Sequence, residues 1–107
     1  MSKEFLAEQV QISIPIEQIR AYCQAQAIKR LSLFGSVLRD DFSPESDVDM
    51  LVEYMPDTVI TLLDMAQQEL DLSNIVGHKV DLRTANELSP YFRQDVIDRA
   101  MLIYEHT

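Results

Sequence analysis

Two aspartates one residue apart, Asp47 and Asp49, are the residues of this sequence most suited to chemistry. They lie in a segment where polar and apolar residues alternate as in a β-strand, so both carboxylates leave the same strand face. Two carboxylates about 4 Å apart repel each other by about 4 kcal/mol at an effective dielectric constant near 20. A divalent cation turns this repulsion into attraction, and carboxylate oxygens suit Mg2+ or Mn2+. The pair therefore predicts a metal site, with a solvated strand face as the alternative.

A glycine–serine pair, Gly35-Ser36, follows a short apolar segment at a point where a strand is expected to end and a helix to begin. Glycine lets the backbone approach a ligand closely, and the free amides of a helix start, together with the serine hydroxyl, can bind phosphate oxygens. Arg39 lies three residues on, roughly on the helical face of Ser36. We therefore expect Gly35, Ser36 and Arg39 to bind a nucleotide. The alternatives are that Ser36 only caps a helix and that Arg39 pairs with Asp40 or Glu45.

A third carboxylate, Asp81, lies in a later segment where Val80 and Leu82 alternate with it and are expected to point inward. Asp81 then points away from the apolar face of its strand. If this strand is the neighbour of the strand with Asp47 and Asp49, the three carboxylates can form one metal site. Taken alone, an aspartate such as Asp81 is more often a surface residue than a metal ligand.

The elements that must position these residues follow from apolar periodicity and from turn residues. The first four, in chain order, are a helix over 15–27, a strand over 31–34, a short helix over 36–41 and a strand over 47–54. A helix capped by Asp57 or Thr58 follows and ends near Gly77. The chain then continues with a strand over 79–83 and a last helix that starts at Ser89-Pro90. The helix that ends near Gly77 is expected to carry the apolar stripe Val59, Leu62, Leu63, Ala66 and Leu70. The last helix is expected to carry the apolar stripe Phe92, Val96, Ala100 and Ile103 or Tyr104. This order predicts an α/β sheet covered by helices.

Composition narrows the class of protein. The chain of 107 residues is long enough for one compact domain, residues 1–107, with 47% apolar residues for its core. Its net charge of -9 argues against direct nucleic-acid binding, because a strongly acidic chain repels polyanions. No apolar stretch approaches the roughly 20 residues of a membrane span, and the start lacks a signal-peptide pattern. With a single cysteine, Cys23, expected in the core, these features predict a cytoplasmic protein without a membrane partner.

The segment Leu33-Phe34-Gly35-Ser36 to Asp47-Val48-Asp49-Met50-Leu51-Val52 resembles the signature of the nucleotidyltransferase (DNA polymerase beta-like) superfamily. Lys79-Val80-Asp81-Leu82 is similar to the strand that carries the third carboxylate of that superfamily. The short chain is most similar to the minimal nucleotidyltransferases, the antitoxins of the MNT/HEPN toxin–antitoxin pairs. The resemblance implies the nucleotidyltransferase fold, a small mixed β-sheet flanked by helices.

The resemblance also implies a mechanism. Two Mg2+ ions (or Mn2+) would be held by Asp47, Asp49 and Asp81, with ATP as the substrate and its triphosphate bound by Gly35 and Ser36. A hydroxyl of the acceptor would attack the α-phosphorus in a two-metal, in-line displacement, and the third aspartate would help to activate that hydroxyl.

The resemblance further implies the acceptor, a tyrosine of a cognate HEPN-domain ribonuclease toxin, to which the antitoxin transfers AMP. Two other functions remain open at this point. In the first, the chain neutralises its toxin by binding alone and the metal site is vestigial. In the second, the chain transfers a nucleotide to a small molecule without any protein partner.

Overall fold

A four-stranded sheet lies at the centre of the protein. The structure is a computed structural model that describes residues 11–106; residues 1–10 and 107 of the predicted domain lie outside this range. The strands are β1 (Ile28–Phe34), β2 (Val48–Tyr54), β3 (Val80–Arg83) and β4 (Met101–Glu105), in the order β3-β2-β1-β4. β1 is antiparallel to both β2 and β4, whereas β2 and β3 are parallel. The sheet is therefore mixed, as expected.

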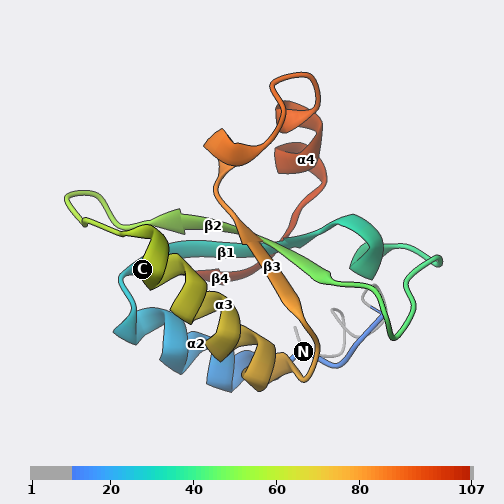
Figure 1. The fold of residues 1–107 in the computed structure, drawn as a ribbon, viewed down its shortest axis with the longest axis horizontal. Helices are drawn as coiled ribbons and strands as arrows, with labels where there is room; N and C mark the ends of the chain where they lie inside the picture. The colour runs from blue at the N-terminus through green and yellow to red at the C-terminus, as the bar shows by residue number, and fades with distance from the viewer. Residues whose placement is uncertain (1–10, 107) are drawn as a thin grey trace.

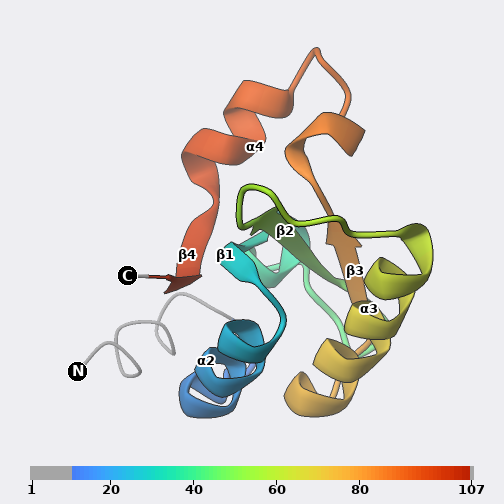
Figure 2. The ribbon, with the colours of Figure 1, turned by 90° about the vertical axis from the view of Figure 1, so that its left-hand side faces the viewer.

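The helices divide between the two faces of the sheet. α2 (Ile16–Ala25) and α3 (Leu62–Val76) cover one face, and α3 is also the crossover between the parallel strands β2 and β3 (Figure 1). The short 3-10 helices η1 (Gly35–Leu38) and η2 (Ala85–Glu87) and the helix α4 (Arg93–Arg99) complete the chain. η2 and α4 project beyond the other face (Figure 2), which leaves part of the sheet open. Of the helices in residues 11–106, not one combines the length and the apolar character needed to cross a bilayer.

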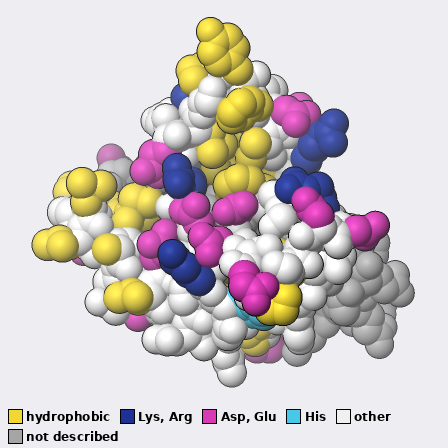
Figure 3. All heavy atoms as spheres, turned by 45° about the vertical axis from the view of Figure 1, so that its right-hand side comes forward, with side chains coloured by type: hydrophobic (Ala, Val, Ile, Leu, Met, Phe, Trp, Pro, Cys, Tyr) yellow, Lys and Arg dark blue, Asp and Glu magenta, His cyan; other side chains and the backbone are white. Residues whose placement is uncertain are grey.

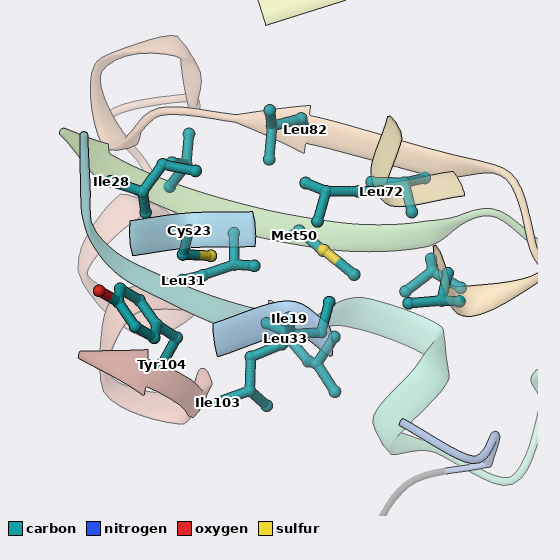
Figure 4. Packing of buried hydrophobic residues seen from close by; sticks show 14 of the residues in the cluster. Ile19, Cys23, Ile28, Leu31, Leu33, Met50, Leu72, Leu82, Ile103 and Tyr104 are labelled. Atoms are coloured by element: carbon teal, nitrogen blue, oxygen red, sulfur yellow. The ribbon is translucent and has the colours of Figure 1, made fainter. Parts of the chain in front are cut away.

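The hydrophobic core fills the space between the sheet and the helices α2 and α3 (Figure 4). The predicted alternation in β2 is confirmed, because Val48, Met50 and Val52 are all buried. Cys23 is buried in the same cluster, as expected. The remaining members of the core are Ile16, Ile19, Ile28, Leu31, Leu33, Val37, Leu72, Val76, Val80, Leu82, Ile103 and Tyr104.

The predicted buried stripe of α3 is wrong. Val59, Leu62, Leu63 and Leu70 are 62–86% exposed, and the buried residues of α3 are Gln68, Leu72 and Val76. The helix carries apolar residues on two faces, and its true inner face contains a polar residue that hides the pattern. Burial of Gln68 is compensated because its Oε1 accepts a 2.7 Å hydrogen bond from the hydroxyl of Tyr54.

The predicted N-cap of α3, Asp57 or Thr58, is also wrong, because the helix begins later in the chain. The N-cap is Thr61, which forms a capping box with Asp64, so each side chain accepts a hydrogen bond from the backbone of the other residue. The predicted end is confirmed, since Gly77 is the C-cap and has the left-handed φ of 77°.

The predicted last helix is correct only in part. α4 ends at Arg99, Ala100 adopts an extended conformation, and Met101–Glu105 form the strand β4. The expected stripe does not exist as one helical face, because Phe92 is exposed and Ile103 and Tyr104 belong to a strand. These two consecutive residues are both buried next to a register shift between β4 and β1. Pairing with the free edge of β1 outweighs the helical periodicity of this segment.

Candidate active site

Asp49 and Asp81 are direct neighbours across the parallel strands β2 and β3. The register pairs Val48 with Val80 and Asp49 with Asp81, and the two valines are buried on the helix-covered side. Alternation then places both aspartates on the open face of the sheet. Asp47 directly precedes β2 and is partly buried. The expected adjacency of the two strands is thereby confirmed, and parallel pairing brings carboxylates 32 positions apart in the sequence next to each other.

The electrostatics of Asp49 show that the carboxylates influence one another. Burial is the main cause that raises the pKa of Asp49 above its ordinary value, and the charges of Asp81 and Asp47 raise it further. Arg83 and Arg39 oppose this rise. The charges of Asp47, Asp49 and Asp81 therefore act on one another across the site.

The close approach of Asp49 requires a glycine at position 35. Its φ of 79° lies in the left-handed region, and a Cβ at this position would overlap Oδ2 of Asp49. Asp49 lies this close to Gly35 because the sheet register pairs it with Phe34, the last residue of β1. The backbone turn after β1 therefore lies directly against a carboxylate of the cluster, and only glycine fits there.

Ser36 and Arg39 follow in the short helix η1 and just after it. Ser36 lies inside η1, while Phe34 is its N-cap residue, and no side chain caps this turn; the cap alternative for Ser36 is therefore wrong. The expected ion pair of Arg39 exists with a different partner, because its Nε lies 3.2 Å from Oδ1 of Asp41. Arg39 is exposed, so this pair contributes little to stability and leaves the guanidinium available.

Two further arginines near the carboxylates were not identified from the sequence. Arg83 donates from Nε and Nη2 to the two carboxylate oxygens of Asp81, at 3.0 and 3.3 Å. Arg99 of α4 lines a pocket of about 330 Å3 together with Gly35 and Arg39. The sequence contains a signal for Arg83, because it lies two residues after Asp81 on the same strand and therefore shares its face. None existed for Arg99, whose approach to Gly35 depends on the path of the chain over the open face.

The donor set suits a divalent cation, although the ligands are not assembled around one. Among residues 11–106, no three His, Cys, Asp or Glu side chains converge closely enough to hold a metal ion. Asp81 instead accepts both hydrogen bonds from Arg83. The carboxylate oxygens of Asp47, Asp49 and Asp81 are nevertheless the donors that Mg2+ prefers. The pKa of Asp49 is raised by burial first and then by the charges of Asp81 and Asp47, and a bound cation would oppose both effects. Their role as metal ligands stays a prediction.

The surface over these elements combines three kinds of side chain (Figure 3). Acidic residues gather near the centre of the view, and Lys and Arg side chains lie around them. Hydrophobic side chains lie between the acidic residues and the projecting segment that contains α4. The arrangement can bring together a cation, an anionic ligand and an apolar group.

Comparison with known proteins assigns the family. Residues 17–107 match the family model described as polymerase beta, nucleotidyltransferase. The chain is 32% identical over 74 residues to a "putative protein adenylyltransferase" of Methanocaldococcus jannaschii, which covers 69% of this chain and 77% of the relative.

Solved structures agree with this assignment. One described as a "putative minimal nucleotidyltransferase" has a TM-score of 0.66 at 32% identity, and the match covers 80% of this chain and 86% of the other. A toxin–antitoxin structure with AMP-PNP has a TM-score of 0.69 at 17% identity, covering 88% of this chain and 76% of the other. A structure of a tri-AMPylated Shewanella oneidensis HEPN toxin in complex with an MNT antitoxin has a TM-score of 0.60 at 17% identity, covering 85% and 70%. The last two likenesses show a shared fold. The chain therefore belongs to the polymerase beta-like nucleotidyltransferase family.

Proposed function

We propose that this protein transfers AMP from ATP to a tyrosine hydroxyl of a HEPN ribonuclease toxin and thereby acts as its antitoxin. The observation that carries the proposal is the placement of Asp49 beside Asp81 and against the backbone of Gly35. The name of the Methanocaldococcus jannaschii relative supports transfer of an adenylyl group to protein. The fold shared with the MNT antitoxin complex, whose toxin is tri-AMPylated, supports the kind of partner.

The triphosphate is assigned to the side of the cluster where η1 begins. The backbone at Gly35 can approach phosphate oxygens closely, and the hydroxyl of Ser36 can donate to them. Arg39 and Arg99 line the pocket over Gly35, where Arg99 forms a 2.8 Å surface ion pair with Asp95 of the same helix. Guanidinium groups are strong donors to phosphate, so exchange of a weak surface ion pair for a phosphate contact is favourable.

The reaction joins the tyrosine oxygen to the α-phosphorus of ATP. It breaks the bond between that phosphorus and the oxygen that bridges the α- and β-phosphates. Pyrophosphate leaves with the bonding electrons, and the tyrosine proton passes to Asp81 as general base. Mg2+ held by Asp47, Asp49 and Asp81 would neutralise phosphate charge and polarise the attacking hydroxyl. Asp49 has the central place in this set, since it neighbours both Asp81 and Gly35.

A transferred AMP accounts for neutralisation in physical terms. It adds bulk and negative charge to the toxin at a surface where a ribonuclease must accept the phosphates of RNA, and like charges repel. The net charge of -9 on this chain likewise fits an acceptor on a protein better than one on a nucleic acid.

The test incubates the protein with the product of the adjacent gene, Mg2+ or Mn2+, and ATP labelled at the α-phosphate. We expect the label to appear on a tyrosine of the partner, with a mass gain of one or more AMP units and loss of its ribonuclease activity. Absence of any AMP-sized gain across metals and nucleotides would refute the proposal.

A double variant, Asp47→Asn with Asp49→Asn, separates transfer from simple binding. It keeps the size of both side chains and removes two charges, so the fold is expected to persist. We expect no label and no neutralisation with this variant. Full neutralisation by the unlabelled complex would instead favour the binding-only antitoxin, and a labelled small molecule without any partner would favour the third function.

A further inference from the structure

A groove of about 660 Å3 lies on the open face of the sheet, beneath the segment that contains η2 and α4. Its floor comes from β1, β2 and β4, and its walls come from the residues after β3 and from α4. Its lining includes Ser32, Leu51, Thr84, Ile97, Ala100 and Leu102. None of the residues assigned above to the carboxylate cluster or to the phosphates lines this groove.

The groove begins one step along the strands from the carboxylates. Leu51 is two residues beyond Asp49 on β2 and therefore shares its face. Its partner on β1 is Ser32, just as Phe34 is the partner of Asp49. An occupant of the groove that reaches past Leu51 thus arrives at Asp49, because residues two apart on a strand are separated by about 6.5 Å.

The pocket assigned to the phosphates lies further along β1 than the groove, at Phe34 and Gly35 rather than at Ser32. Gly35, Arg39 and Arg99 line that pocket, and Gly35 contacts the carboxylate of Asp49. In a phosphoryl transfer the attacking and leaving oxygens lie roughly in line on opposite sides of phosphorus. If pyrophosphate leaves toward Gly35 and the arginines, the nucleophile must approach from the side of the groove.

The lining suits an aromatic side chain. Leu51, Ala100, Ile97 and Leu102 provide apolar surface, and the last two are 40% and 46% exposed although they are hydrophobic. Hydrophobic side chains are visible in this position next to the acidic cluster (Figure 3). Pockets of this size and character accept one apolar group with a few polar contacts, which Ser32 and Thr84 can supply.

We propose that this groove binds the acceptor tyrosine of the partner protein, with the ring on Leu51, Ile97 and Leu102 and the hydroxyl directed to Asp49 and Asp81. The inference rests on the proposed function and adds the place where the acceptor enters. It makes α4 a substrate-binding element of the chain, with Ile97 for the acceptor and Arg99 for the phosphates.

The test uses Ile97→Gln combined with Leu102→Gln, two exposed positions where glutamine should be tolerated. We expect the KM for the partner protein to rise at least about tenfold through lost apolar contact. The affinity for ATP, measured by calorimetry with Mg2+ and a non-hydrolysable analogue, should stay within about twofold. The matched control is Leu70→Gln, an exposed leucine on α3, across the sheet from the groove, which should change neither quantity.

The outcomes distinguish this inference from the proposed function. If wild-type protein labels the partner and the double variant does so with unchanged KM, the inference fails while the function stands. If the double variant loses affinity for ATP and keeps its KM, the groove holds the nucleoside and the inference fails. If wild-type protein transfers no AMP to any tyrosine, the proposed function fails and takes this inference with it.

Discussion

Replacement of Gly35 by alanine tests how closely the backbone after β1 is matched to the carboxylate of Asp49. Gly77 offers a matched control, because it has nearly the same left-handed φ, 77° against 79°, and an open surrounding in which an added Cβ meets nothing within 4 Å. An L-residue in this conformation costs about 1–2 kcal/mol. Each 1 kcal/mol lowers the melting temperature of a domain of this size by about 4–8 °C. Both variants should therefore lose stability.

Only the variant at Gly35 should also lose function. Its Cβ would overlap Oδ2 of Asp49, so either the turn or the carboxylate must move. A displacement of about 1 Å at a reacting centre can cost about 100-fold in rate. We expect Gly35→Ala to lower AMP transfer about 100-fold and Gly77→Ala to stay within about twofold, with both measured well below their melting temperatures.

The assay follows labelled AMP on the partner protein, and binding of Mn2+ measured by electron paramagnetic resonance gives a readout independent of turnover. Gly35→Ala should weaken Mn2+ binding, since Asp49 is one of the predicted ligands, whereas Gly77→Ala should not. Equal activity and equal Mn2+ affinity in the two variants would refute the reasoning, because the close contact at Gly35 would then have no consequence.

Three further outcomes can be measured on the purified protein. Arg83→Gln removes the cation that occupies Asp81, so Mn2+ should bind about two- to fivefold more tightly, and unchanged or weaker binding contradicts this role for Arg83. Burial raises the pKa of the Cys23 thiol to about 12, so thiol reagents near pH 8 should modify it only in denaturant. Rapid modification of the native protein would contradict this and would show that the helix α2 opens readily. Burial also raises the pKa of Tyr54 to about 12, which means that folding favours the neutral phenol. The resulting stability is present below about pH 10 and is lost as the pH rises toward 12. Tyr54→Phe should therefore flatten this alkaline decline of the melting temperature. Identical slopes of melting temperature against pH in the two proteins would exclude a contribution from Tyr54.

Local patterns predicted the carboxylate strands well. The alternation from Asp47 to Tyr54 assigned each residue of β2 to its correct face, since a two-residue period has only two solutions and the core side is uniformly apolar. The pairing of Asp49 with Asp81 could be stated only as a condition, because it depends on how β2 and β3 neighbour each other in the sheet. The end of α3 near Gly77 was predictable because glycine commonly terminates helices, and the structure adds its left-handed conformation.

Errors arose where two arrangements satisfy the same local pattern. α3 has apolar residues on two faces, and its inner face became recognisable only through the hydroxyl of Tyr54, which pairs with the buried Gln68. The segment Met101–Glu105 suits a helix or a strand equally well, and the free edge of β1 decides between them. The positions of Arg83 and Arg99 relative to the cluster likewise follow from tertiary structure.

The parallel pairing of β2 with β3 has a consequence for biosynthesis. A parallel pair forms only after its crossover connection exists, and here the connection is the 15-residue helix α3. A nascent chain that has exposed only β1 and β2 can form their antiparallel hairpin, yet it still lacks Asp81 and the wall contributed by α4. The complete site should therefore appear late in synthesis, after both β3 and α4 have docked, and a chain truncated before β3 should transfer no AMP.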